Sequence, residues 1–178
     1  MYILASKSPR RQELLKLLIN EFKVVVSNVD ESKIHANAYD LPLELSKAKA
    51  QTVFKDNQND IIIAADTVVI LDNIVLGKPS NEEDAKRMLK LLSNRTHDVV
   101  TGFTIISKNK VISKSVLTHV TFNYLSDNLI DDYVKTGSPL DKAGAYGIQD
   151  KEFSLVKEIS GSYYNVMGLP IEELKKYL

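Results

Sequence analysis

The chain has 178 residues and a mass of 20.0 kDa, with 44% hydrophobic and 26% charged residues. This composition is typical of a globular protein and excludes a disordered or collagen-like chain. The 23 Lys and Arg residues balance the 23 Asp and Glu residues, which argues against binding a nucleic-acid polymer through many phosphates. The absence of cysteine excludes disulfides, thiolate zinc sites and cysteine nucleophiles.

The sequence predicts neither a membrane span nor a secretion signal. A bilayer span needs about 20 apolar residues, and the richest apolar stretch, residues 61–76, is interrupted by Asp66, Asp72 and Asn73. At the N-terminus the apolar residues precede the basic ones, which is the reverse of the order in signal peptides. We therefore predict a cytoplasmic protein that has no membrane partner.

The first third of the chain predicts two strands and two helices. Residues 1–5 and 22–26 are short apolar runs of the length of buried strands. Ser8 followed by Pro9 is typical of a helix start, with an N-cap hydroxyl and a proline at the first helical position. A second helix is expected over residues 42–54, because Pro42 opens a segment with inward-facing apolar positions.

The central part of the chain predicts a buried strand, a hairpin and a helix. The strand covers the continuous apolar run 61–65, and the hairpin covers residues 68–76. Residues 66–67 are polar and are expected to interrupt this sheet in its centre. Ser80 and Glu83 form the pattern of a capping box, which predicts the start of an amphipathic helix.

The last part of the chain predicts a long antiparallel ribbon followed by shorter elements. Residues 99–106 and 111–122 alternate in places around a polar turn. A helix is expected over residues 126–135, a strand over 153–159, and a final short helix that begins at Pro170. Together these elements predict an α/β fold with a mixed sheet and flanking helices.

Residues 6–11, with the sequence SKSPRR, form the first candidate binding site. They combine two hydroxyls and three cations with the amide groups of a helix N-terminus. Phosphate is the natural ligand of such a group, because arginine and helix amides match phosphoryl oxygens in charge and geometry. The alternative is an ordinary capped helix whose basic residues are solvated.

Asp66 is the second candidate, because it follows a buried apolar run. An unpaired buried carboxylate is costly, so we expect a cation, a metal ion or several hydrogen-bond donors beside it, although a structural salt bridge is the alternative. Glu31, Lys49 and Lys78 are separated in the sequence, and each alone is typical of a solvated surface charge. Together with Asp66 they offer carboxylates to a divalent cation and lysines to phosphate oxygens.

Several common catalytic patterns are absent. The sequence has no P-loop and no Gly-x-Gly dinucleotide fingerprint. The three histidines have neither metal-ligand spacing nor a Glu-x-x-His partner, which argues against a zinc hydrolase. His97 is expected to be a structural hydrogen-bonding residue.

A series of short motifs resembles the Maf family of nucleoside triphosphate pyrophosphatases. The motifs cover essentially the whole chain, occur in the family's order and are jointly specific. They are residues 6–11 (SKSPRR), 13–15 (ELL), 30–31 (DE), 49–50 (KA), 65–69 (ADTVV), 77–79 (GKP), 97–102 (HDVVTG), 141–149 (DKAGAYGIQ), 161–163 (GSY) and 168–170 (GLP).

The resemblance implies a fold and a reaction. The expected fold is one Maf-like domain over residues 1–178, related to inosine-triphosphate pyrophosphatase, with two lobes around a central cleft that holds the nucleotide. The expected reaction cleaves a nucleoside triphosphate between the α and β phosphates and uses a divalent cation, Mg²⁺ or Mn²⁺. A homodimer is the family expectation.

The resemblance also implies roles for individual residues. The family's proton-accepting aspartate corresponds to Asp66. Arg10, Thr67 and Gln149 occupy the positions that mark the subgroup acting on dTTP and UTP. The amide of Gln149 can pair with N3–H and O4 of uracil or thymine, which favours these pyrimidines.

For the reaction we expect Asp66 to orient or deprotonate the attacking water and to share the cation with Glu31. The residues expected to bind the phosphates are Ser8, Arg11, Lys49 and Lys78. Two alternatives stay open at this point. One is a nucleotide-binding regulator of cell division and septum formation, and the other is a pyrophosphatase that acts on a modified nucleotide.

Overall fold

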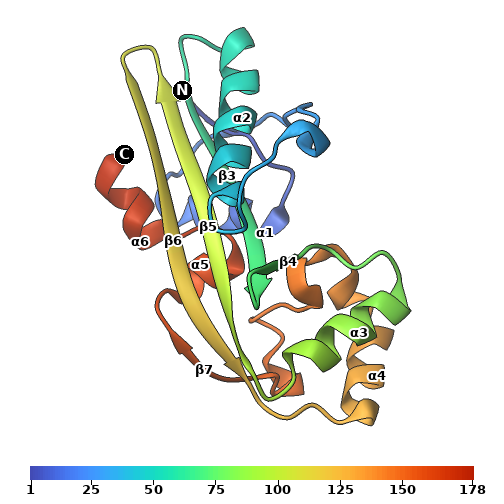
Figure 1. The fold of residues 1–178 in the computed structure, drawn as a ribbon. Helices are drawn as coiled ribbons and strands as arrows, with labels where there is room; N and C mark the ends of the chain where they lie inside the picture. Colours follow the sequence, from blue (N-terminus) through green and yellow to red (C-terminus); the bar gives the residue numbers. More distant parts are fainter.

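The apolar runs of the sequence form one seven-stranded mixed sheet in the computed structural model, which describes residues 1–178 (Figure 1). The spatial order is β2-β1-β3-β5-β6-β7, and β4 pairs with β3. The β2–β1 and β1–β3 pairs are parallel, whereas the others are antiparallel. The strands are β1 (Tyr2–Leu4), β2 (Lys23–Val24), β3 (Ile61–Leu71), β4 (Ile74–Leu76), β5 (Thr96–Ser107), β6 (Lys110–Phe122) and β7 (Val156–Ser160).

Helices cover both faces of the sheet. They are α1 (Pro9–Lys16), α2 (Leu41–Asp56), α3 (Glu82–Leu92), α4 (Asp127–Lys135), α5 (Tyr163–Met167) and α6 (Ile171–Leu174). Short 3₁₀ turns are η1 (Glu31–Lys33), η2 (Ser138–Asp141), η3 (Ala143–Ala145), η4 (Lys151–Phe153) and η5 (Lys175–Tyr177). None of the helices is long and apolar enough to cross a bilayer.

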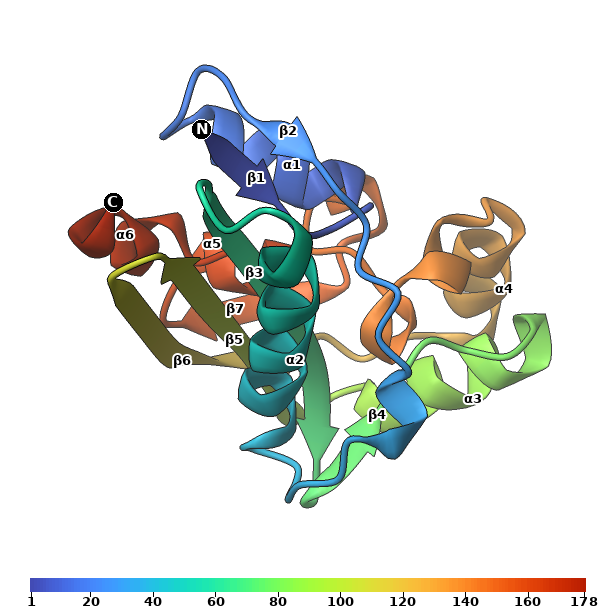
Figure 2. The same ribbon diagram turned by 90° about the horizontal axis from the view of Figure 1, so that it is seen from above.

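Side-chain alternation along β3 divides the core of the sheet into two layers. Ile62 and Ala64 pack with α2, whereas Ile63 and Ala65 pack with α1 and α6. Successive residues of a strand point to opposite faces, so α2 lies on one side of the sheet and α1 on the other (Figure 2).

A second lobe surrounds the far end of the β5–β6 ribbon. Here α3 and α4 pack together with the η3 segment on the ends of β3, β5 and β6, and their buried residues form a separate apolar cluster (Figure 1). The ribbon runs through both lobes. The predicted mixed α/β fold with two lobes is therefore confirmed.

The prediction that residues 66–67 interrupt the sheet is wrong. β3 is continuous and pairs with β5 along residues 62–70. The interruption lies in the strands on its other edge, because β3 pairs with β1 only as far as Ile63 and with β4 only from Val69 onward. Asp66 therefore lies in the middle of a strand, on an edge left open between β1 and β4.

The helix starts were predicted with mixed success. Ser8 caps α1 with Pro9 behind it, as predicted. The predicted capping box at Ser80 is displaced by one residue, because the side chain of Asn81 accepts the amide of Asp84 at 2.8 Å. Helix α5 was not predicted, and β2 and β7 are shorter than expected.

A close approach at Gly102 sets the position of α2. Gly102 pairs with Asp66 across the β3–β5 ladder. A Cβ atom at Gly102 would lie 2.4 Å from the backbone nitrogen of Leu43, at the start of α2. The missing side chain therefore lets the backbone of α2 rest directly on the sheet beside Asp66.

His97 is a buried structural residue, as predicted. Its Nε2 atom and the hydroxyl of Tyr146 are 2.7 Å apart, and its ring packs edge-on against Phe122. Burial lowers the pKa of His97 from 6.5 to about 4, although the charge of Asp98 acts in the opposite direction.

We expect His97 to make the protein less stable in acid. Between pH 6.5 and 4 the unfolded state binds a proton at His97 that the folded state does not, so the free energy of unfolding falls as the pH falls. The shift limits this contribution to about 3 kcal/mol. Urea denaturation at pH 7 and pH 4.5 measures the effect.

The matched variant is His97→Gln, which keeps a polar side chain but does not titrate. Carboxylates titrate in both proteins, so the quantity of interest is the difference between the two pH dependences. The free energy of unfolding of wild type should fall by about 2 to 3 kcal/mol more than that of the variant. An equal decrease in the free energy of unfolding of both proteins would show that His97 is not a source of the acid sensitivity.

Candidate active site

Asp66 and Thr67 are neighbours in β3, and they point to opposite faces of the sheet. Asp66 lies on the face covered by α2, and Thr67 lies on the face covered by α1. Both lie where one edge of β3 has no neighbouring strand. This position gives the two side chains separate sets of partners within a single open region of the sheet.

On the α2 face, Lys49 lies between two carboxylates. Its Nζ atom is 2.6 Å from Oδ1 of Asp66 and 3.0 Å from Oε1 of Glu31. The side chains of Lys49 and Asp66 are 13% and 14% exposed, so the pair is largely buried. The Oδ2 atom of Asp66 accepts no hydrogen bond from the protein, which leaves it available to a water molecule or a ligand.

The loop that carries Glu31 is fixed at both ends of its polar segment. Asp30 caps η1 by accepting the amide and the hydroxyl of Ser32. Further on, the hydroxyl of Tyr39 donates to Oδ2 of Asp98 at 2.7 Å. These contacts hold the loop over α2, where Glu31 reaches Lys49.

On the other face, Arg11 joins α1 to β3 and to the C-terminal part of the chain. Its Nε atom donates to the carbonyl of Gly168 at 2.8 Å, and Nη2 donates to the hydroxyl of Thr67 at 3.1 Å. The Thr67 hydroxyl lies 2.8 Å from that of Thr101. Burial lowers the pKa of Arg11, and the charge of Asp66 opposes this shift.

Ser8 organises the start of α1. Its Oγ atom accepts the amide of Arg11 at 3.4 Å, and its own amide donates to Oγ of Ser6 at 3.2 Å. The segment connects β1 directly to α1, so the helix N-terminus begins close to the open edge of β3. Such a terminus favours an anionic ligand.

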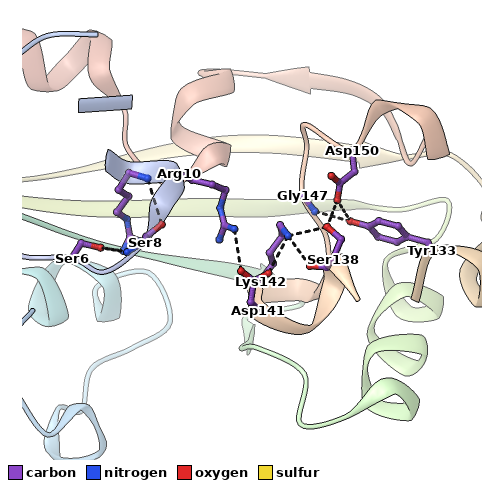
Figure 3. A network of polar contacts seen from close by, with 10 residues as sticks. Ser6, Ser8, Arg10, Tyr133, Ser138, Asp141, Lys142, Gly147 and Asp150 are labelled. Carbon is purple, nitrogen blue, oxygen red and sulfur yellow. Dashed lines mark hydrogen bonds and ion pairs between the residues drawn. The ribbon is translucent and has the colours of Figure 1, made fainter. Parts of the chain in front are cut away.

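Arg10 connects the two lobes (Figure 3). Its Nη1 atom is 3.5 Å from Oδ2 of Asp141 in η2, and Asp141 also lies 3.0 Å from the ammonium group of Lys142. Partial burial would raise the pKa of Asp141, but the hydrogen bond from Lys142 and the positive charges of Lys142 and Arg10 leave it lowered. Asp141 is therefore an anion between two cations.

Gln149 lies beside the same group of residues. Its amide packs over Gly147, where an added Cβ atom would be 3.0 Å from Oε1 of Gln149 and 2.9 Å from Cε of Lys142. The side chain makes no hydrogen bond within the protein, so its two donors and its carbonyl are free to bind a ligand.

Lys78 is exposed and forms no ion pair. It follows Gly77, whose carbonyl accepts the amide of Gly144 at 3.1 Å. This contact places the segment of Lys78 against the η3 turn, next to Lys142. The lysine is free to move toward an anion.

Asp66 and Glu31 are the carboxylates predicted to hold a divalent cation. No group of three or more His, Cys, Asp or Glu side chains converges anywhere in the chain. The two carboxylates nevertheless converge on one point, which is the ammonium group of Lys49. This donor set suits Mg²⁺, which is often held by one or two carboxylates together with the phosphates of a substrate.

Some residues of this region were not predicted. Thr101 and Gly168 hold Thr67 and Arg11, and Tyr133, Ser138 and Asp150 hold the segment of Gln149. Tyr133 lies on the apolar stripe of α4, so the sequence indicates only a core residue. Thr101 and Gly168 lie in the motifs at residues 97–102 and 168–170, but the sequence assigned neither of them a role.

Comparison with known proteins gives a consistent result. The family model described as Maf-like protein matches residues 1–178. The chain is 50% identical over 172 residues to the dTTP/UTP pyrophosphatase of Thermococcus onnurineus (strain NA1), which covers 97% of this chain and 93% of the relative. It is 48% identical over 177 residues to the dTTP/UTP pyrophosphatase of Bacillus cereus (strain G9842), and the match covers 99% of this chain and 93% of that protein.

A solved structure resembles the fold. The Staphylococcus aureus Ham1 protein superposes with a TM-score of 0.60 over 99% of this chain and 96% of that chain. Its sequence is 12% identical, so the similarity concerns the fold alone. It agrees with the mixed sheet and flanking helices described above.

The Lys49–Asp66 ion pair leads to a stability prediction. Lys49→Met keeps the side-chain length but leaves Asp66 as an unpaired, largely buried carboxylate, which should lower the free energy of unfolding by about 2 to 3 kcal/mol. Adding Asp66→Asn removes the unpaired charge and should recover part of this loss. Urea denaturation at neutral pH measures all three proteins.

Lys47→Met is the matched control on the same helix. Lys47 pairs with Glu44 at 2.7 Å, but both side chains are more than one-third exposed, so its loss should cost less than about 1 kcal/mol. If Lys49→Met and Lys47→Met lower the free energy of unfolding equally, the Lys49–Asp66 pair stabilises the protein no more than an exposed pair does.

Proposed function

The chain belongs to the Maf family, and we propose that it hydrolyses dTTP and UTP to the nucleoside monophosphate and pyrophosphate. One observation carries the proposal. Residues far apart in the sequence form one series of neighbours that runs from the free amide of Gln149 through the carboxylate of Asp66 to Glu31. In order, the series is Gln149, Lys142, Asp141, Arg10, Arg11, Thr67, Asp66, Lys49 and Glu31.

The two ends of this series suit the two ends of a nucleoside triphosphate. Gln149 offers hydrogen bonds in a plane, as a base requires. Around the open edge of β3 the series offers Lys49 on one face and Arg11 with the N-terminus of α1 on the other, and a triphosphate requires such cations and amides. The residues proposed to bind phosphate oxygens are Ser8, Arg11, Lys49 and Lys78. Two relatives about 50% identical to this chain are named for the same substrates.

Asp66 is the residue proposed to activate the attacking water. Its Oδ1 atom is held by Lys49 at 2.6 Å, so the carboxylate has a fixed orientation. Its free Oδ2 atom can accept a hydrogen bond from a water molecule and take its proton. Breaking a phosphoanhydride requires mainly positioning and neutralisation of charge, which the neighbouring lysines and arginines supply.

We propose that Asp66 and Glu31 also hold a divalent cation, Mg²⁺ or Mn²⁺, when substrate is bound. Such a cation neutralises charge on the phosphate oxygens and on the leaving pyrophosphate. The protein contributes the two carboxylates, and Lys49 keeps them close together before the substrate arrives.

Base selection is assigned to Gln149 with Arg10 and Thr67. The carbonyl of Gln149 can accept N3–H of uracil or thymine, while its NH₂ group donates to O4. Arg10 lies near this region through Asp141. Thr67 contacts Arg11 in the structure, so we propose that its influence on selection passes through that arginine.

Because both lobes contribute residues, we propose that residues 1–178 act as one domain. The homodimer and the cytoplasmic location stay predictions.

The deciding experiment identifies the products. The purified protein is incubated with dTTP, UTP, CTP, ATP and GTP in Mg²⁺ or Mn²⁺, and pyrophosphate and orthophosphate are measured separately. We expect pyrophosphate from dTTP and UTP. Asp66→Asn should lower kcat by about 10²- to 10⁴-fold, because it removes the proton acceptor.

Asp72→Asn is the matched control. Asp72 lies at the end of the same strand, is exposed, and has a positive φ of 52° that asparagine tolerates. Near-full turnover by folded Asp66→Asn would contradict the role of Asp66. Orthophosphate as product would contradict cleavage between the α and β phosphates. No turnover of any nucleotide would favour a nucleotide-binding regulator or a modified substrate.

A second experiment tests base selection. We expect Gln149→Ala to lower the ratio of kcat/KM for UTP to that for CTP by about tenfold or more, because it removes two hydrogen bonds to the base. Steady-state kinetics with both nucleotides give the ratio. An unchanged ratio would remove Gln149 from the base site.

A further inference from the structure

Tyr133 is a fully buried residue of α4 whose hydroxyl group has two partners far along the chain. The hydroxyl accepts the amide of Gly147 at 3.0 Å and donates to Oδ2 of Asp150 at 2.6 Å (Figure 3). The two partners flank Gln149. One phenol group therefore holds both sides of the segment that carries the proposed base-reading residue.

The same segment is held a second time through Asp150. Its Oδ2 atom also accepts the hydroxyl of Ser138 at 2.7 Å. Ser138 in turn accepts Lys142 Nζ at its carbonyl and hydroxyl oxygens, at 2.6 and 2.9 Å. The segment from Gly147 to Asp150 is thus connected by hydrogen bonds to α4 and η2.

Gly147 transmits this anchoring to the side chain of Gln149. The amide of Gln149 lies directly over Gly147, within 3.1 Å of the position that a Cβ atom would occupy. The backbone amide of Gly147 is bonded to Tyr133. A shift of Gly147 would therefore change the surface on which the amide of Gln149 rests.

Packing holds the segment at Ile148, which is buried in the apolar cluster of the second lobe. Gly147, Ile148 and Asp150 also line an open pocket of about 420 Å³ together with Val156 and Ile159 of β7. The segment has no regular secondary structure apart from turns. The hydrogen bonds to Tyr133 and Ser138 fix the polar ends of the segment on either side of buried Ile148.

We propose that Tyr133, together with Asp150, is a positioning residue for base selection that fixes the backbone from Gly147 to Asp150 and so fixes the place of the Gln149 amide. This inference rests on the proposed function. The place of the amide matters because its carbonyl must meet N3–H and its NH₂ group must meet O4 of uracil or thymine at the same time. A shift of the segment would weaken both hydrogen bonds.

Tyr133→Phe tests the proposal because it removes the hydroxyl and keeps the buried ring, which packs against Phe153. We expect the ratio of kcat/KM for UTP to that for CTP to fall about three- to tenfold. The loss should appear mainly as a higher KM for UTP, since no group at the phosphates changes. In a background of Gln149→Ala, the same substitution should leave the ratio unchanged.

Tyr146→Phe is the matched control. Tyr146 is buried in the same apolar cluster, but its hydroxyl contacts His97 and not the segment of Gln149. Its removal should leave the nucleotide ratio at the wild-type value. A similar fall in the ratio for both tyrosine variants would show a general loss of packing and would overturn the proposal.

Two substitutions of Asp150 give an independent test. Asp150→Ala removes the acceptor and should lower the ratio as Tyr133→Phe does. Asp150→Asn retains a carbonyl oxygen that can accept hydrogen bonds from Tyr133 and Ser138, so its nucleotide ratio should stay close to the wild-type value. If the ratio of kcat/KM for UTP to that for CTP is no higher in Asp150→Asn than in Asp150→Ala, the role of this hydrogen bond is overturned.

Binding measurements separate this inference from the proposed function. The affinities of α,β-imido UTP and α,β-imido CTP are measured by calorimetry for wild type and Tyr133→Phe. Normal hydrolysis with an unchanged base preference in the variant overturns the inference alone. Wild type could bind the UTP analogue more tightly without hydrolysing any nucleotide, and Tyr133→Phe could reduce this preference. That result would overturn the proposed reaction and support the inference. No preference in wild type overturns both.

Discussion

The pairing of β3 is the constraint on which the candidate site depends. One edge is bonded to β5 along the region of the site, while the other edge loses β1 after Ile63 and gains β4 only at Val69. The strand is therefore rigid where its edge is open. Alternation along it sends Asp66 toward α2 and Thr67 toward α1. A flexible loop in this place would not hold two adjacent side chains on opposite faces of the sheet.

Local features of the fold could be predicted from the sequence, whereas features set by distant partners could not. The cap at Ser8 depends only on neighbouring residues, and the β5–β6 ribbon depends on one short turn. The continuity of β3 at Asp66 depends on β5, which lies over 30 residues further along the chain. Without knowledge of this partner strand, Asp66 and Thr67 in an apolar run indicate that the strand ends there.

The same distinction applies to the candidate site. The residues proposed to touch a nucleotide have recognisable chemistry and could be predicted. The residues that hold them, such as Tyr133 and Thr101, look like ordinary core or strand positions. Their polar atoms acquire meaning only from contacts such as that between Tyr133 and Gly147. Sequence patterns therefore identify ligand-binding residues more readily than they identify the residues that position them.

The contact between Arg11 and Gly168 has a consequence for how the protein is made. The guanidinium group is synthesised near the start of the chain, and its carbonyl partner lies 157 positions later. A nascent chain that has not yet reached α5 leaves Arg11 without this partner and the open edge of β3 without its final support. The candidate site is consequently completed only when the residues after α5 have been synthesised.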